Sequence, residues 1–340
     1  MSTPIHLTLI LSEFVEAYRA QLQGGRAITA PSLELMVGRG VVIHRAQWAS
    51  HRALGAAQQH VLDVAGLDSN DVQYASAPLS WLGQTGERLQ GTLLHAQPVH
   101  FATGMSDVAL RGAPGMAAPE IDELMQSLTP LVQSAGVQLR RAVSGAWYLH
   151  AQRVLDVATC SPSYARVNGL YSSMPTGRDA RVLSLLMTEL QMALHEHPAN
   201  RVRERNGLAP LNAVWFWGGG ALPSNSVACT LPPAFSDEAY VKGLWMACGS
   251  SAQPLPQSAL PMLASLAANA VVVPGSSDVA ALESEWLAPS IRALQARSID
   301  ELVVRFDEWA LSLRRAHMRR FWKASRSLAA LDDVFSPRPQ

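Results

Sequence analysis

The chain contains few charged residues and no excess of either sign. Only 16% of its 340 residues are charged, and 27 basic side chains balance 27 acidic ones. A disordered chain would combine low hydrophobicity with a charge imbalance, and a nucleic-acid binder that acts through bulk charge needs a basic surface. The low charge and the 48% of hydrophobic residues therefore predict a folded protein and argue against nucleic acid as a partner.

Cysteines and long apolar runs are also scarce. Cys160, Cys229 and Cys248 form an odd set without metal-like spacing, which favours neither a disulfide framework nor a zinc site. We therefore expect a reduced, cytoplasmic setting. No run of 18 apolar residues predicts a membrane span, and we expect no membrane partner. The short apolar run over 5–11 lacks a preceding basic region and is followed by Glu13, which indicates a first strand instead of a signal peptide.

The hydrophobic pattern predicts strands that alternate loosely with helices. We expect an α/β fold with a mixed sheet flanked by helices, in one domain over 1–335 with a possible subdivision near 251–261 and a frayed tail at 336–340. Pro98 and Pro130 are expected to interrupt a strand and a helix. Predicted strands cover 5–11, 92–101, 211–217 and 270–273, with a hairpin over 136–151 that turns at Ser144-Gly145. Predicted helices cover 50–65, 119–135, 178–196, 278–295 and 299–330.

The helix over 178–196 has the strongest periodicity. Its apolar positions predict one buried stripe. The stripe comprises Val182, Leu185, Leu186, Leu190, Ala193 and Leu194. Glu189 lies close to it, and a carboxylate beside an apolar stripe needs a partner.

The most informative segment is 187–224. His195 and His197 end a helix and could ligate a metal, with Glu189 as a distant third ligand, or could interact with the helix dipole. Positions i and i+2 do not share a helix face, so we expect no metal site there. Asn200 and Arg203 lie in a polar turn that could grip an anion or carry solvated ion pairs.

Three glycines, Gly218, Gly219 and Gly220, follow the predicted buried strand. Glycines there can let backbone N–H groups approach an anion, or can form a sharp turn beside Trp217. The fuller phosphate-loop patterns are missing. His100 lies at the end of another predicted strand. Its side chain could face a ligand crevice or form a structural hydrogen bond. These glycines, with His195, His197, Asn200, Arg203, Glu189 and His100, form the predicted ligand site, for which we expect a small anionic metabolite.

Several stretches resemble a known family. QPVHF (97–101), MPTGRDA (174–180), ELQMALHEHPAN (189–200) and NAVWFWGGGALP (212–223) are similar to bacterial regulatory proteins of RpfE type, which are phosphoglycerate-mutase-like. The last two stretches also resemble archaeal-type cofactor-independent phosphoglycerate mutases of the alkaline-phosphatase superfamily. The resemblance implies a related, degenerate α/β fold with a ligand crevice.

The departures from the mutase pattern concern its metal centre. Such mutases hold two metal ions with several Asp and His side chains, and their first Asp lies on the opening strand. Here the first aspartate is Asp63, and His317 is the only histidine after His197. Trp217 stands where the mutase loop has arginine. The resemblance therefore implies a regulatory ligand-binding protein without catalytic residues, metal or cofactor.

Two alternatives follow from the same residues. One is a metal-dependent phosphotransferase or phosphatase with rearranged ligands. The other is a scaffold that presents the basic segment 312–326 to a protein partner, although a solvated basic face explains that segment equally.

Overall fold

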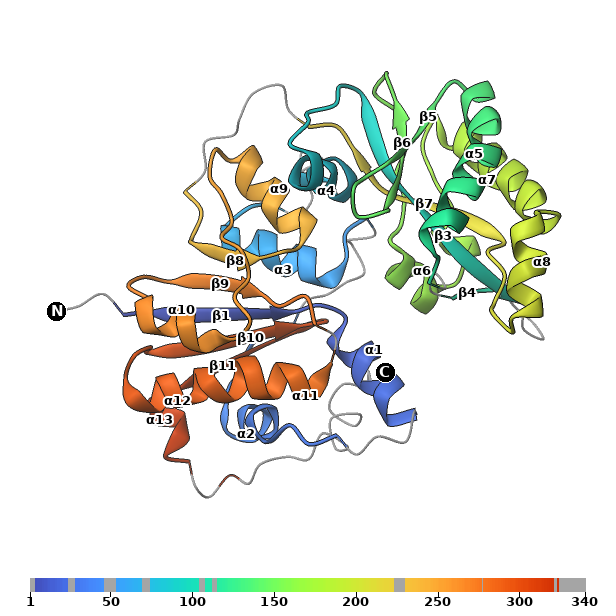
Figure 1. Ribbon diagram of the computed structural model, residues 1–340. Coiled ribbons are helices and arrows are strands. Elements are labelled where there is room, and N and C mark those ends of the chain that lie inside the picture. Colours follow the sequence, from blue (N-terminus) through green and yellow to red (C-terminus); the bar gives the residue numbers. More distant parts are fainter. Residues whose placement is uncertain are drawn as a thin grey trace.

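The computed structural model describes residues 4–23, 28–45, 53–68, 74–103, 108–111, 115–222, 230–276, 278–320 and 323. These residues form a mixed α/β structure with two sheets, each flanked by helices (Figure 1). The expected fold class is confirmed, with two sheets in place of one. Within the described residues, no helix is long and apolar enough to cross a membrane.

The first sheet has six strands in the order β2-β11-β10-β1-β9-β8. The strands β8, β9, β1 and β10 run parallel, and β11 runs antiparallel to both of its neighbours, β10 and β2. Alternate side chains of a parallel strand face opposite sides, and Leu9 and Ile10 of β1 accordingly enter different cores. The strands are β1 (His6–Leu11), β2 (Val41–Arg45), β8 (Ala234–Ser236), β9 (Ala270–Val273), β10 (Glu301–Phe306) and β11 (Trp309–Arg314).

Helices from both ends of the chain surround this sheet. They are α1 (Phe14–Gln23), α2 (Pro31–Arg39), α3 (Ala56–Ala65), α4 (Ser76–Thr85), α9 (Ala239–Ala247), α10 (Ala259–Ser265), α11 (Val279–Ala281), the π-helix η4 (Leu282–Leu287), α12 (Ala288–Ala296) and α13 (Arg315–Met318). The segment 251–261, where we expected a subdivision, connects α9 to α10 on this same sheet. The expected single domain stays a prediction.

The second sheet is built from the continuous stretch 92–220. Its order is β4-β3-β6-β5, and β7 pairs with β3 on the edge opposite β6. The helices α5 and α7 pack on one face around a separate core. The strands are β3 (Thr92–Thr103), β4 (Val108–Arg111), β5 (Gln138–Arg141), β6 (Trp147–Ala151) and β7 (Ala213–Gly220). The helices are α5 (Ala118–Ser134), α6 (Pro162–Asn168), the 3-10 turn η3 (Tyr171–Ser173), α7 (Ala180–His195) and α8 (Pro198–Arg205).

The helices α4 and α9 join the two halves through a close crossing (Figure 1). Gly83 of α4 and Gly243 of α9 lie at the crossing, and a Cβ atom at either position would overlap backbone of the opposite helix. Only glycine allows the two backbones to approach this closely.

Pro98 and Pro130 do not interrupt the strand and the helix in which they lie, contrary to expectation. Pro98 lies inside β3, where the pairing with β6 has ended at His95 and the pairing with β4 begins at His100. Among the described strands only β7 pairs with β3 over this stretch, so the missing N–H is tolerated. Pro130 likewise lies within α5, which continues past it as one helix.

Two predictions differ from the structure, one about an element and one about a buried face. The segment 299–330 forms β10, a turn and β11 before the short helix α13, so the expected long basic helix is not present in its described residues. On α7 the buried side chains are Leu183, Leu186, Met187, Leu190 and Leu194. Val182 and Leu185, which we expected to be buried, are 38% and 55% exposed.

The cysteines also differ from expectation. Cys160 is free and buried, but Cys248, directly after α9, is disulfide-bonded.

Candidate functional site

The strand β7 separates the residues that we expected to share one crevice. The segment with His195, His197, Asn200 and Arg203 precedes the strand, whereas the three glycines form its last residues. Eight residues of extended chain span roughly 25 Å. Gly220 pairs with Leu93 inside the sheet, so these glycines belong to the strand and not to a loop beyond it.

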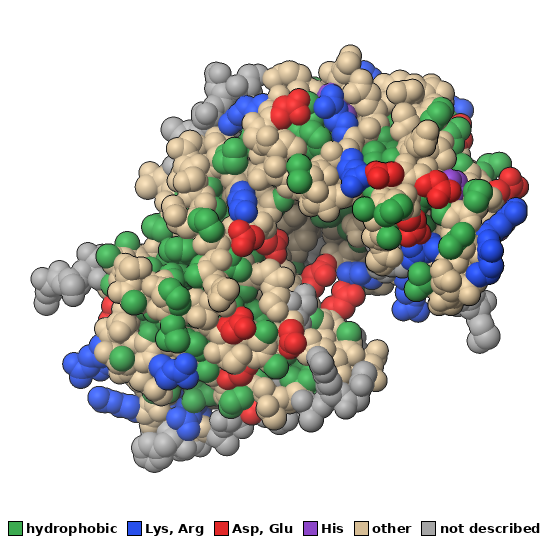
Figure 2. Space-filling view, in the orientation of Figure 1, with side chains coloured by type: hydrophobic (Ala, Val, Ile, Leu, Met, Phe, Trp, Pro, Cys, Tyr) green, Lys and Arg blue, Asp and Glu red, His purple; other side chains and the backbone are tan. Residues whose placement is uncertain are grey.

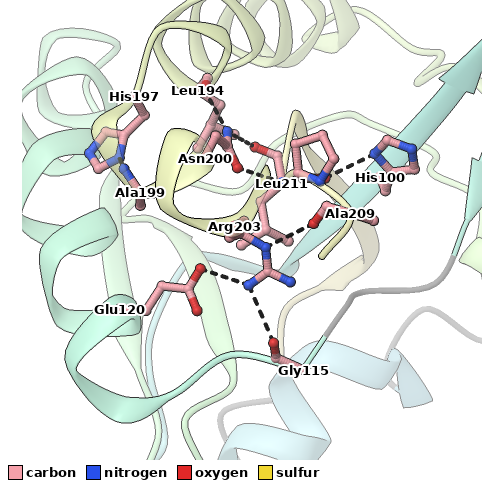
Figure 3. A network of polar contacts seen from close by, with 11 residues as sticks. His100, Gly115, Glu120, Leu194, His197, Ala199, Asn200, Arg203, Ala209 and Leu211 are labelled. Atoms are coloured by element: carbon pink, nitrogen blue, oxygen red, sulfur yellow. Dashed lines mark hydrogen bonds and ion pairs between the residues drawn. The ribbon is translucent and has the colours of Figure 1, made fainter. Parts of the chain in front are cut away.

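Asn200 holds the end of α7 to the start of β7 (Figure 3). Its amide nitrogen donates to the carbonyl oxygens of Leu194 and Leu211 at 2.6 and 2.7 Å, and its amide oxygen accepts the N–H of Leu211 at 2.8 Å. The side chain is 4% exposed. All three bonds are to backbone, so the side chain acts as a structural brace.

Arg203 occupies a similar position in the next turn of α8. Its Nε atom donates to the carbonyl of Ala209 at 2.8 Å, and its Nη1 atom donates to Glu120 of α5 at 2.7 Å and to the carbonyl of Gly115 at 3.3 Å (Figure 3). The guanidinium is 3% exposed, and Nη2 has no partner among the described residues. The two bonds of Nη1 join α8 to α5 and to the segment before it.

The two histidines nearest this brace bind backbone atoms. His197 is the N-cap of α8, and its Nδ1 atom accepts the N–H of Ala199 at 3.2 Å. His100 binds the carbonyl of Pro210 through Nδ1 at 2.9 Å. For His100 the structure shows the structural hydrogen bond of the two uses that the sequence left open. His197 caps the following helix, a use that the sequence analysis did not include.

Glu189 and His195 lie elsewhere, in an open hollow of about 730 Å³ beside α7. We call it the α7 hollow. It is lined by Leu131, Thr188, Glu189, Gln191, Met192, Ala193, His195, Glu196 and Asn212. Two of the predicted ligand residues therefore share a concave surface. Neither Glu189 nor Glu196 forms an ion pair with another described residue.

Polar groups converge beside Gly218, at the other end of β7. This glycine has φ +65°, and a Cβ atom on it would lie 2.8 Å from Cβ of Ser76 and 3.1 Å from Cδ2 of His95. Ser76 Oγ accepts the amide N–H of Gln58 at 2.7 Å and lies 2.9 Å from Nε2 of His95. Oγ and Nε2 therefore share one hydrogen bond, and the tautomer of His95 sets which atom donates. The sequence did not indicate this pair, since 19 residues separate its members and no motif contains them.

The environment of His95 makes it a weak base. The ring is stacked on Trp217 with centroids 4.2 Å apart and lies 5.0 Å from the ring of Tyr148. Desolvation by these neighbours lowers the pKa of His95 to about 3. An efficient general base has a pKa near the working pH, and Ser76 has no exposed surface. The pair fixes α4 to the sheet and is poorly placed for nucleophilic chemistry.

Carboxyl groups gather at the carboxyl ends of the parallel strands in the first sheet, where α/β proteins commonly bind ligands. Glu238 accepts a hydrogen bond from Ser12 at 3.1 Å, and Asp307 accepts the N–H of Val15 at 2.9 Å. Burial raises the pKa of Glu238 and raises the pKa of Asp307 to about 6. Figure 2 shows acidic side chains along the hollow between the two halves. Across it Arg166 of α6 binds Glu16 of α1 at 2.8 Å.

The described residues do not fit a two-metal centre. No group of three or more His, Cys, Asp or Glu side chains among them is placed to hold a metal ion.

Comparison with known proteins gives one local relationship. No family model matches the chain. A 2,3-bisphosphoglycerate-independent phosphoglycerate mutase from Methanothrix thermoacetophila is 40% identical over 73 residues, which are 21% of this chain and 19% of that protein. A probable mutase of the same type from Geobacter sulfurreducens is 40% identical over 50 residues, 15% of this chain and 12% of that protein. The chain is locally similar to cofactor-independent phosphoglycerate mutases. The similar segment spans about a fifth of the first relative's length.

Two solved structures align over nearly the whole chain. The cofactor-independent phosphoglycerate mutase from Thermoplasma acidophilum aligns over 96% of this chain and 94% of its own, with a TM-score of 0.42 and 13% identity. The PH0037 protein from Pyrococcus horikoshii aligns over 92% and 88%, with a TM-score of 0.44 and 14% identity.

Proposed function

We propose that this chain is a non-catalytic regulatory protein, related to the cofactor-independent mutases, that binds its ligand in the α7 hollow. The observation that carries the proposal is the contrast between two places. The serine–histidine pair at Ser76 and His95 is buried and weakly basic, whereas Glu189 and His195 line an open hollow. The regulatory role rests on the resemblance to proteins of RpfE type.

The charges that line the α7 hollow restrict the chemical class of ligand that it can bind. Its lining contains the carboxylates Glu189 and Glu196, one histidine and neither lysine nor arginine. An anionic metabolite, the ligand expected from the sequence, would meet like charges there. The proposal therefore takes a cationic or neutral polar ligand. The cytoplasmic setting stays a prediction, which cell fractionation would test.

Turnover measurements test the non-catalytic part. The purified chain is assayed with 2- and 3-phosphoglycerate and a general phosphatase substrate, with and without added Mn²⁺ or Zn²⁺. We expect no turnover above that of Ser76→Ala, whose fold is checked by circular dichroism. Turnover that depends on Ser76 would refute this part.

Thermal-shift measurements test the binding part. A panel of organic cations, polar metabolites and phosphorylated metabolites is screened against the intact chain. We expect stabilisation by a member of the first two groups that is reduced in Glu189→Gln and kept in Glu204→Gln, a matched change on the exposed side of α8. Stabilisation only by phosphorylated compounds, or equal loss in both variants, would contradict the α7 hollow as the site.

One observation favours the enzymatic alternative. Ser76 lies in the first turn of α4, where the helix dipole stabilises negative charge on a nucleophile or phosphoryl group. Metal analysis of the purified chain separates the two functions, because a metal-dependent phosphotransferase would carry a stoichiometric divalent ion.

A further inference from the structure

The outward face of α7 carries apolar side chains in a regular pattern. Val182, Leu185 and Met192 are 38%, 55% and 69% exposed. With Glu189 and Glu196 they follow one another at intervals of three and four residues along the helix. This is the a/d spacing of helices that pack against another helix. We call these five residues the outer seam.

The outer seam is separate from the stripe that holds α7 in the fold. Leu183, Leu186, Leu190 and Leu194 are each at most 1% exposed and pack into the core of the five-stranded half. A surface helix needs one apolar stripe, and the second stripe remains exposed in the part of the chain that the structure describes. Exposed apolar side chains repeated along one helix face, with charged side chains between them, are typical of helices that bind a partner helix.

The C-terminal half of the outer seam borders a concave surface. Glu189, Met192 and Glu196 line the α7 hollow, and Leu131 of α5 contributes to its wall. Side chains of a second helix that lay along the seam could enter this hollow.

The charge of the outer seam and the α7 hollow determines which kind of helix can bind there. The seam and the hollow carry two carboxylates without an ion-pair partner among the described residues, and the lining has neither lysine nor arginine. In an antiparallel pair with α7 of a second copy, Glu189 would lie near the same residue of the other copy. Like charges at such a contact are destabilising. A basic helix satisfies both carboxylates.

We propose that the outer seam and the α7 hollow dock an amphipathic, basic helix of another protein, with its apolar side chains on Leu185 and Met192 and its Lys or Arg side chains beside Glu189 and Glu196. The inference rests on the α7 hollow as the binding site and names its ligand as a helical segment of a partner.

A synthetic helix tests the charge requirement. The probe is a fluorescently labelled peptide with Leu at a and d positions and Lys at the flanking positions, compared with a scrambled peptide of the same composition. Fluorescence anisotropy with the full chain should show saturable binding of the first peptide only. We expect Glu189→Lys to weaken binding about tenfold or more, and Glu204→Lys, an exposed residue of α8 with the same change of charge, to alter it less than about twofold.

A second pair of variants tests the apolar requirement. Leu185→Ser removes an exposed apolar side chain from the seam, and Val202→Ser removes one that is 50% exposed on α8. Both changes lie on the surface, so both variants should fold. Binding should fall in Leu185→Ser and persist in Val202→Ser.

Three control results would overturn the inference. They are equal binding of the scrambled peptide, equal effects of the two variants in either pair, and a dimer in sedimentation velocity that Leu185→Ser dissociates. The last would identify a second copy as the occupant. If the full chain does not bind the peptide but small molecules still stabilise it in thermal-shift measurements, the inference is refuted and the proposed function stands.

Discussion

Asp307 accepts a hydrogen bond from the backbone N–H of Val15 at 2.9 Å, so a residue near the C-terminus caps the first helix of the chain. The carboxyl group follows β10, and the helix it caps follows β1, the neighbouring parallel strand. Capping by a carboxylate offsets part of the cost of burying it, but burial still raises its pKa to about 6.

The raised pKa predicts a pH dependence of stability. Between about pH 4 and pH 6 the folded chain holds the Asp307 proton and the unfolded chain loses it, so stability falls as pH rises through this window. The change should be roughly 1–2 kcal/mol, less than a two-unit shift implies because the group is partly exposed. Urea denaturation from pH 4 to 7 measures it. Asp307→Asn should flatten the profile, and an unchanged slope in that variant would assign the dependence to another group.

The buried ion pair of Arg203 and Glu120 predicts a large effect of substitution. Arg203→Met removes the partner of a largely buried carboxylate and the bond to Ala209, so we expect a loss of about 3 kcal/mol in the free energy of unfolding. Arg201→Met, on the exposed side of the same helix, should cost less than about 0.5 kcal/mol. Denaturant titration compares them. Similar losses in the two variants would show that the bonds of Arg203 do not hold α8 to α5.

The crossing of α4 and α9 predicts sensitivity to a single methyl group. Gly243→Ala should destabilise the chain by about 2 kcal/mol or more, because the added Cβ overlaps backbone of α4 and neither helix can move independently of its sheet. Gly275→Ala, where a Cβ meets no atom within 4 Å, is the matched control. The midpoint of thermal unfolding should be lower for Gly243→Ala than for Gly275→Ala. Equal midpoints would mean that α4 and α9 are packed less closely than described.

The desolvated ring of His95 should stay neutral across the physiological range. Its pKa of about 3 predicts no change of its imidazole chemical shifts between pH 5 and 8, with the signal assigned through His95→Gln. Nuclear magnetic resonance titration measures this. A midpoint near 6 would show a solvated imidazole and would restore Ser76 and His95 as a candidate catalytic pair.

Much of the architecture could be predicted from local patterns. The runs around β1, β7 and β9 are apolar and short, and α5 and α7 have clear helical periods, so their types follow from burial and spacing. The second sheet could not be predicted, because strand pairing depends on partners far apart in the chain. The antiparallel pair β10 and β11 was missed because its turn contains Asp307 at φ +40° in place of the usual glycine signal.

The buried face of α7 was ambiguous for a physical reason. Apolar residues stand at both Val182 and Leu183, and the spacing 182–185 fits a helical stripe as well as 183–186. Only the packing of the second sheet decides which of the two is covered. The ligand site stays a prediction. Glu189 and His195 share a surface, whereas Asn200, Arg203, His197 and His100 bind other parts of the chain and the three glycines end β7.

The stretch 92–220 begins and ends on hydrogen-bonded neighbours, since Leu93 of β3 pairs with Gly220 of β7. A block of chain whose two ends meet in this way can be gained, lost or exchanged as a unit while the remaining strands keep their order. The outer seam therefore lies on a block that the chain enters and leaves through neighbouring strands, and the six-stranded half keeps cores of its own.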